Sequence, residues 1–154
     1  MPTRAQVAAG LRQHRMRGVT LIELMVVLAI VAILASLAVA SYRRYVLRAN
    51  RTDATSALLR IQVGEEKYFL QNNTYTTDVT DQPPTGLGVA SPTPSGFYKF
   101  LITGDPNSTN NIATSFLATA TAQSTQTQDT SCVTLTITDQ GLRNSAPSTT
   151  DCWR

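Results

Sequence analysis

Residues 17–43 read RGVTLIELMVVLAIVAILASLAVASYR, and this stretch decides the fold. Within it, the 19 residues from Leu24 to Tyr42 carry no charge and are mostly Leu, Ile, Val and Ala. A helix of that length spans about 28 Å, close to the roughly 30 Å hydrocarbon core of a bilayer. The sequence therefore predicts a helix that is inserted in a membrane at some stage.

Glu23 lies near the start of this apolar run. A charge at full membrane depth costs at least ~2.5–3.5 kcal/mol. A carboxylate in the first turn of a helix recovers only ~0.3–1 kcal/mol from the helix dipole. We therefore expect a second cation close to Glu23. The alternative is that Glu23 only neutralises its own helix terminus.

A cleaved secretory signal is the alternative interpretation of residues 1–40. The start is basic, and Ala38-Val39-Ala40 supplies a cleavage site of the A-x-A type. Against this, the apolar run is longer than the usual h-region of roughly 7–15 residues, and it contains Glu23. Arginines flank the run on both sides, so their distribution does not fix which end faces the cytoplasm.

The segment Arg17-Gly18-Val19-Thr20-Leu21-Ile22-Glu23 resembles the class III signal of type IV prepilins. The likeness continues through residues 54–73 to Cys152-Trp153 and is greatest to PilE-type pilins of Gram-negative bacteria. In that family a prepilin peptidase cuts after the Gly of a basic leader, on the cytoplasmic side, and N-methylates the new terminus. The resemblance implies that residues 1–18 are a cleaved leader, with Gly18 and Val19 as the processing site.

The same resemblance makes Glu23 the fifth mature residue and residues 19–42 the transmembrane and assembly half of the helix. The α-amino group created at Val19 is mostly protonated at neutral pH, and in the filament it can meet Glu23 of a neighbouring subunit. Such a buried pair fixes register, because leaving one charge unpaired is costly. Val19 replaces the usual Phe or Met, and Ala40 stands where many pilins have a Pro, so no kink is forced there.

Residues 43–71 are expected to continue the helix as an amphipathic half. This segment contains no Pro, and small or apolar residues recur on one helical face. These residues are Ala54, Ala57, Leu58, Ile61, Gly64 and Tyr68. The arginine cluster 43–51 is interpreted as a solvated collar near the membrane, with contact to acidic lipid headgroups as the alternative.

Residues 72–96 are dense in Pro and Gly, which predicts a long loop, the αβ-loop of pilins. Strands are expected at 97–103, 112–122 and 132–138, with a short fourth strand at 142–144. In the third, Val133, Leu135 and Ile137 alternate with threonines. The expected fold class is α+β, the type IV pilin fold: a long N-terminal helix packed on a small antiparallel sheet, with residues 97–154 forming the sheet and a disulfide-closed C-terminal region.

Cys132 and Cys152 are the only cysteines, and both lie in the half that the resemblance places outside the cytoplasm. An oxidising compartment favours a disulfide between them. Closing a loop of about 20 residues stabilises a fold by roughly 3 kcal/mol in the chain-entropy model. In pilins the corresponding loop is exposed and often forms a contact surface.

Composition argues against an enzyme. The single histidine, His14, lies in the expected leader, and the rest of the chain has no Gly-rich phosphate loop and no G-x-S-x-G sequence. We therefore expect no catalytic residues, no cofactor and no metal. Asp78 and Asp81 fall in a polar loop and are expected to be solvated, with calcium binding as the weaker alternative.

The resemblance implies a structural subunit of a type IV pilus, major or minor, that supports adhesion, twitching motility or DNA uptake. Its expected partners are the prepilin peptidase, other pilin subunits in a homo- or heteropolymer, and the inner-membrane assembly platform. The expected location is the inner membrane, crossed once with the head in the periplasm, and then the extracellular pilus.

Two alternatives remain at this point. A pseudopilin of type II secretion shares the signal and the helix, but commonly lacks the C-terminal disulfide. A DNA-receptor pilin would need clustered cations on the head. From Ile61 onward the chain has four basic and eight acidic residues, so head charge does not support DNA binding.

Overall fold

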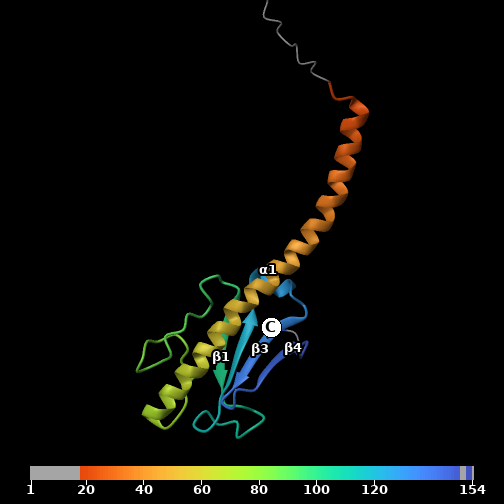
Figure 1. Cartoon of the computed structure of the whole chain (residues 1–154). Helices are drawn as coiled ribbons and strands as arrows, with labels where there is room; N and C mark the ends of the chain where they lie inside the picture. Colours follow the sequence, from red (N-terminus) through yellow and green to blue (C-terminus); the bar gives the residue numbers. More distant parts are fainter. Residues whose placement is uncertain (1–17, 150–151, 154) are drawn as a thin grey trace, which may run out of the picture. The chain divides into compact units, whose positions relative to one another are not determined.

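The computed structural model describes residues 18–149 and 152–153. The chain divides into two compact units, Met1–Ala40, here called the anchor, and Ser41–Arg154, here called the head. The elements are the helix α1 (Leu21–Asn72), the strands β1 (Tyr98–Thr103) and β2 (Leu117–Ala122), the 3₁₀ helix η1 (Ser124–Gln128), and the strands β3 (Cys132–Thr138) and β4 (Arg143–Pro147). The helix α1 is continuous from the anchor into the head (Figure 1).

The C-terminal end of α1 is set by two asparagines. Asn73 has a φ of 55°, the left-handed conformation that commonly follows a helix, and Asn tolerates it better than most residues. Its N–H donates to the carbonyl of Phe69 at 2.8 Å. The side-chain amide of Asn72 donates to the carbonyl of Tyr68 at 3.0 Å. These bonds satisfy carbonyls that the last turn otherwise leaves free.

The head is a two-layer α+β structure, as the sequence predicts. Its sheet has the order β1-β2-β3-β4 with every neighbouring pair antiparallel. The head part of α1 lies across one face of this sheet (Figure 1). The register brings Phe100, Ala120, Leu135 and Ser145 into one row across the four strands. Residues in such a row point to the same side, so this row faces the helix.

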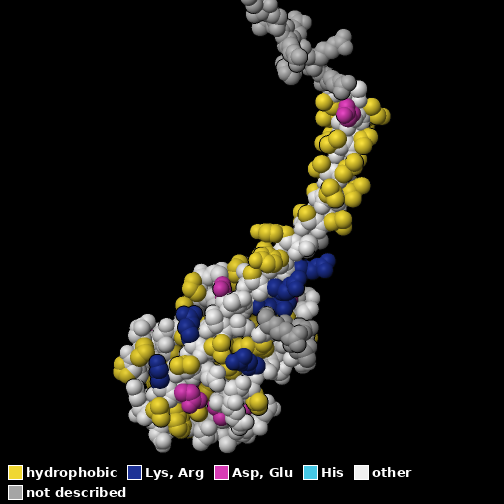
Figure 2. Space-filling view, viewed as in Figure 1, with side chains coloured by type: hydrophobic (Ala, Val, Ile, Leu, Met, Phe, Trp, Pro, Cys, Tyr) yellow, Lys and Arg dark blue, Asp and Glu magenta, His cyan; other side chains and the backbone are white. Residues whose placement is uncertain are grey.

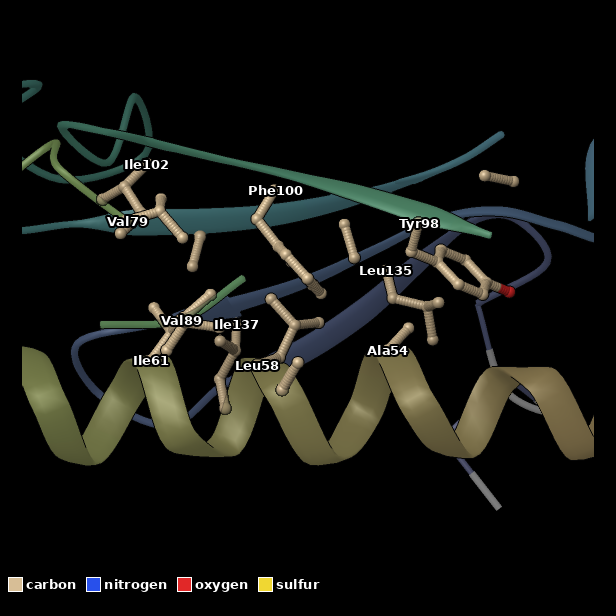
Figure 3. Close-up of a cluster of buried hydrophobic side chains, with 14 of the residues drawn as sticks. Ala54, Leu58, Ile61, Val79, Val89, Tyr98, Phe100, Ile102, Leu135 and Ile137 are labelled. Atoms are coloured by element: carbon tan, nitrogen blue, oxygen red, sulfur yellow. The ribbon is translucent and has the colours of Figure 1, made fainter. Parts of the chain in front are cut away.

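The core forms between α1 and the inner face of the sheet (Figure 3). The inward residues of β2 are all alanine, between large side chains on β1 and on β3, so the helix approaches β2 without steric conflict. The buried apolar residues of the three strands are Tyr98, Phe100, Ile102, Ala118, Ala120, Ala122, Cys132, Leu135 and Ile137. The helix contributes Ala54, Ala57, Leu58 and Ile61.

The strand expected at 112–122 begins later, at Leu117, so its first five residues were assigned wrongly. Asn111 explains the difference. Its side-chain oxygen accepts the N–H of Ala113 at 3.0 Å, and its carbonyl accepts the N–H groups of Thr114 and Ser115. These N–H groups are therefore committed to a turn and are not available to a neighbouring strand.

The last strand also differs from its expected range of 142–144, because β4 runs from Arg143 to Pro147. Its sequence RNSAP has no apolar alternation, since it is an edge strand on which only Ser145 is buried. An irregularity in the β3–β4 pairing between Cys132 and Thr134 changes the alternation at the start of β3. Cys132 is therefore buried, while Val133, expected on the buried face, is only half-buried.

The loop between α1 and β1 is tied to the core by two valines. Val79 and Val89 are buried, and the N–H of Val89 donates to the carbonyl of Val79 at 2.8 Å. The carboxylate of Asp78 accepts the N–H groups of Thr80 and Asp81, and these bonds hold its pKa below the ordinary value. Asp78 therefore shapes this loop from within.

Glu65 is a buried carboxylate on α1 beneath the start of this loop. Its side chain is fully buried, and Oε2 accepts the N–H of Thr76 at 3.0 Å. Oε1 is buried with no hydrogen-bond partner among the described residues. Burial raises the pKa of Glu65 from 4.5 to about 7; the Thr76 N–H opposes this shift, and the neighbouring charge of Glu66 adds to it.

Protonation of Glu65 stabilises the head, because its folded pKa lies above the unfolded one. Its contribution is complete below about pH 4.5 and is lost as the pH rises through 7. We predict that the free energy of unfolding falls by on the order of 2–3 kcal/mol from pH 4.5 to 8. Urea titrations of the chain in non-ionic detergent, followed by Trp153 fluorescence, measure this decrease.

Glu65→Gln should abolish most of the decrease, whereas Glu66→Gln, at the exposed neighbouring position, should retain it. Equal pH dependence in both variants would contradict the assignment.

Candidate functional site

The N-terminal end of α1 holds a reciprocal pair of capping bonds. Thr20 precedes the first helical residue; its side-chain oxygen accepts the N–H of Glu23 at 3.3 Å, and the Glu23 carboxylate accepts the N–H of Thr20 at 3.5 Å. This is a capping box, whose sequence signal is Thr or Ser followed three residues later by Glu. The signal is present in the sequence, and our sequence reasoning missed it. Glu23 thus has a local role within its own helix.

Gly18 and Val19 lie just before this cap, and both are exposed. Apart from the two chain neighbours of Gly18, no heavy atom of the described residues lies within 4 Å of where its β-carbon would be. The fold of the chain therefore places no demand on a glycine at this position. Any requirement for glycine there must come from another molecule.

The described anchor is apolar on all sides. Its large hydrophobic side chains are at least half exposed, from Val19 to Val39 (Figure 2). By length and composition, α1 can cross a membrane. The hydroxyl of Ser36 donates to the carbonyl of Ile33 at 2.7 Å, so this polar group is satisfied within the helix. A helix that is apolar all round needs an apolar environment, which is either lipid or other helices.

The disulfide Cys132–Cys152 is present, with a Cα–Cα distance of 5.7 Å. It holds the C-terminal end against β4, where the indole N–H of Trp153 donates to the carbonyl of Asn144 at 2.8 Å. The guanidinium of Arg143 lies over the Trp153 ring, 5.4 Å from its centre. The disulfide loop therefore positions an exposed cation at the edge of the sheet.

A buried polar network joins η1 to the helix. Gln126 is fully buried, and its amide donates to the carbonyl of Leu47 at 3.1 Å and to the hydroxyl of Tyr98 at 3.0 Å. Burial raises the pKa of Tyr98 to about 12. The guanidinium of Arg51 donates two hydrogen bonds to the carboxylate of Asp129, at 2.7 and 2.8 Å. Nothing in the Ser-, Thr- and Gln-rich sequence of this segment distinguishes Gln126 from its exposed neighbours.

Exposed charge on the head differs from its formal charge. Several carboxylates of the head are withdrawn from solvent: Glu65 and Asp105 are buried, and Asp129 is buried and paired with Arg51. The exposed acidic residues of the described head are Asp53, Glu66 and Asp81. Its exposed cations are Arg43, Arg44, Arg48, Arg60, Lys67, Lys99 and Arg143. Four of these seven cations precede Ile61 and were outside the acidic count from the sequence. Part of the positive surface is visible in Figure 2.

A cavity of about 510 Å³ lies between α1 and the loop that follows it. Val63 and Leu87 give it apolar walls, and Arg60 and Lys67 lie at its rim. Within residues 18–149 and 152–153, no three His, Cys, Asp or Glu side chains lie close enough together to hold a metal ion. The described surface thus offers cations and apolar grooves.

Comparison with known proteins gives two family matches. Residues 40–136 match the family described as type IV minor pilin ComP, DNA uptake sequence receptor. Residues 13–39 match the prokaryotic N-terminal methylation motif. Among solved structures, a type IV pilin from Shewanella oneidensis is 22% identical, and the alignment covers 70% of this chain and 98% of that chain with a TM-score of 0.48. No curated protein matches the chain.

Proposed function

This chain belongs to the family of type IV minor pilins of the ComP type, and we propose that its head binds double-stranded DNA during DNA uptake. As a member of that family it is a structural subunit of a type IV pilus that polymerises with other pilin subunits. The expected pilin resemblance is thereby confirmed. The match is to a pilus family, so the pseudopilin alternative is set aside.

The excess of exposed cations over exposed carboxylates carries the DNA proposal. Seven exposed cations face solvent on the described head, against three exposed acidic residues. DNA affinity comes mainly from neutralising phosphates, so exposed charge matters more than formal charge. The family description, which names a DNA uptake sequence receptor, supports the same function.

Arg143 is the cation best prepared for a phosphate contact. It is exposed, it forms no ion pair within the described residues, and the Trp153 ring restricts its movement. A cation that is already oriented loses less conformational entropy on binding. Arg143 is paired with Ile137 in the β3–β4 register, and Ile137 is buried toward α1. The Arg143 side chain therefore leaves the sheet on the face that α1 covers. Lys99 alternates with buried neighbours on β1 and lies on the opposite face.

We place the processing cut between Gly18 and Val19. The open space around Gly18 supports this, because a glycine that the fold does not need fits the requirement of a peptidase. The cut would create an α-amino group at Val19, close in sequence to Glu23. In this proposal Glu23 meets the α-amino group of a neighbouring subunit, in addition to capping its own helix.

The proposed topology has the apolar anchor across the inner membrane and the head in the periplasm before assembly. The exposed apolar surface of the anchor and the disulfide of the head support it, because disulfides persist in oxidising compartments. Assembly then transfers the anchor from lipid to a bundle of like helices, and its apolar surface stays out of water throughout.

Replacing Gly18 tests the position of the cut. Gly18→Leu should leave the first 18 residues attached, which intact-protein mass spectrometry detects as the full-length mass. The fold should be unaffected, since the space around Gly18 is open. Val19→Phe, which introduces the residue common in pilins, should be processed as usual. Normal cleavage of Gly18→Leu would place the cut elsewhere.

Replacing Glu23 tests its role between subunits. Glu23→Ala should be processed normally but should reduce the amount of this chain in sheared pili at least tenfold, because the neighbouring α-amino group loses its partner. Thr20→Val removes the capping hydroxyl while keeping Glu23, and we expect near-normal incorporation. Immunoblots of sheared pili measure both. Equal loss in the two variants would mean that capping is the whole role of Glu23.

DNA binding is tested by its salt dependence. The full-length chain in non-ionic detergent should bind a DNA duplex more weakly as salt rises, with a logarithmic slope of about 0.9 for each phosphate contact. Arg143→Gln should lower this slope by about 0.9, and Arg143→Lys should largely preserve it. Lys99→Gln, on the opposite face of the sheet, is the matched control and should leave it unchanged. Filter binding at 50 and 200 mM salt measures the slope. No binding at the lower salt would exclude a DNA receptor.

A further inference from the structure

Two arginines of the head form a niche with the segment that follows η1. Arg44 and Arg48 are one helical turn apart on α1, and they line a cavity of about 300 Å³ together with residues 128–131. We call this cavity the arginine niche. Its other wall carries the exposed hydroxyls of Thr130 and Ser131. All of these residues belong to the head.

The niche keeps an uncompensated positive charge. Its one carboxylate, Asp129, is occupied by Arg51 at 2.7 and 2.8 Å, and only 5% of the side chain is exposed. Arg44 and Arg48 are exposed and form no ion pair within the described residues. The Nε–H of Arg48 donates to the carbonyl of Arg44 at 3.4 Å. Two guanidinium groups thus face solvent beside two hydroxyl donors.

The walls of the niche are fixed before any ligand arrives. Gln126 is fully buried and binds the carbonyl of Leu47, which lies between the two arginines in sequence. The Arg51–Asp129 pair joins the same two segments a turn further on. Binding therefore requires no reorganisation of the backbone on either side of the niche.

Sequence distance places the niche at the depth of lipid headgroups. The uncharged run ends at Tyr42, so Arg44 and Arg48 follow it by two and six residues, about 3 and 9 Å along a helix. The headgroup region extends about 5–8 Å beyond the hydrocarbon core on each side. Tyr42 and Tyr45 are each 68% exposed, as in the aromatic belts that mark membrane interfaces.

We infer that the arginine niche binds the phosphate of an acidic phospholipid headgroup in the unassembled subunit. Arg44 and Arg48 contact the phosphate oxygens, and Thr130 and Ser131 donate hydrogen bonds to the same group. The contact holds one face of the head against the bilayer. The subunit loses this lipid contact when it enters the filament, where lipid is absent. This inference rests on the proposed membrane insertion.

The test uses the full-length chain in zwitterionic micelles, titrated with short-chain phosphatidylglycerol while the amide resonances of Thr130 and Ser131 are followed by NMR. Short-chain phosphatidylcholine should bind at least tenfold more weakly. Arg44→Gln/Arg48→Gln should weaken phosphatidylglycerol binding about 25-fold, roughly fivefold for each arginine. Arg60→Gln/Lys67→Gln, which removes two exposed cations of another cavity, is the matched control and should not change it.

Inorganic phosphate and a DNA duplex form the remaining arms of the experiment. Inorganic phosphate binding as tightly as phosphatidylglycerol would overturn the lipid assignment in favour of a general phosphate site. DNA that displaces the same resonances, with no response to phosphatidylglycerol, would assign the arginines to the DNA surface and also overturn it. Equal binding of both lipids would exclude recognition of acidic headgroups. None of these outcomes bears on membrane insertion, which recovery of the full-length chain in the membrane fraction tests independently.

Discussion

The need to keep the apolar surface of one helix away from water governs this molecule. Between Leu24 and Val39 the large hydrophobic side chains point outward on every side and are not buried by any other part of the described chain. In the head the same helix has a single apolar stripe, and Ala54, Leu58 and Ile61 bury it against the sheet. One continuous element therefore meets two environments. Its first part needs lipid or other helices, and its second part buries one stripe against its own chain.

The parts of the fold that the sequence predicts are those with strong periodicity. The apolar run leaves no alternative to a long helix, and the alternation of Leu135 and Ile137 with threonines identifies β3. The weak predictions failed where local hydrogen bonds override propensity. Asn111 turned a β-compatible segment into a turn, and β4 extends to Pro147, beyond the expected 142–144, because an edge strand that buries only Ser145 has no apolar pattern to mark its end. Neither effect leaves an apolar pattern in the sequence.

The candidate site shows the same division. Gly18 and Glu23 could be proposed from the sequence because they occur in a fixed order before an apolar run, a relation that is local in sequence. Thr20, the capping partner of Glu23, is equally local in sequence. It carries no charge, so a search based on charged residues does not find it. Gln126 depends on a helix some eighty residues earlier in the chain, so no local pattern could reveal it.

Charge gives the clearest case of information that exists only in three dimensions. A count along the chain makes the region from Ile61 onward acidic, and this argued against a DNA-binding head. Within the described part of this region folding buries Glu65 and Asp105 and pairs Asp129 with Arg51, which leaves Lys67, Lys99 and Arg143 exposed against Glu66 and Asp81. The exposed arginines that precede Ile61 supply the rest of the positive surface of the head. A polymer such as DNA responds to the field outside the surface, to which buried and paired carboxylates contribute little. The formal charge of the chain from Ile61 onward therefore does not describe the surface charge of the head.

The bonds between Thr20 and Glu23 have a consequence for maturation. Both residues lie on the C-terminal side of a cut after Gly18, and the backbone N–H of Thr20 is part of the peptide bond that links it to Val19. Under the proposed cut, loss of the leader leaves the start of the helix intact, since the groups that close its first turn all remain with the mature subunit. In this proposal the peptidase acts ahead of the first helical residue, and the capped first turn passes unchanged into the mature subunit.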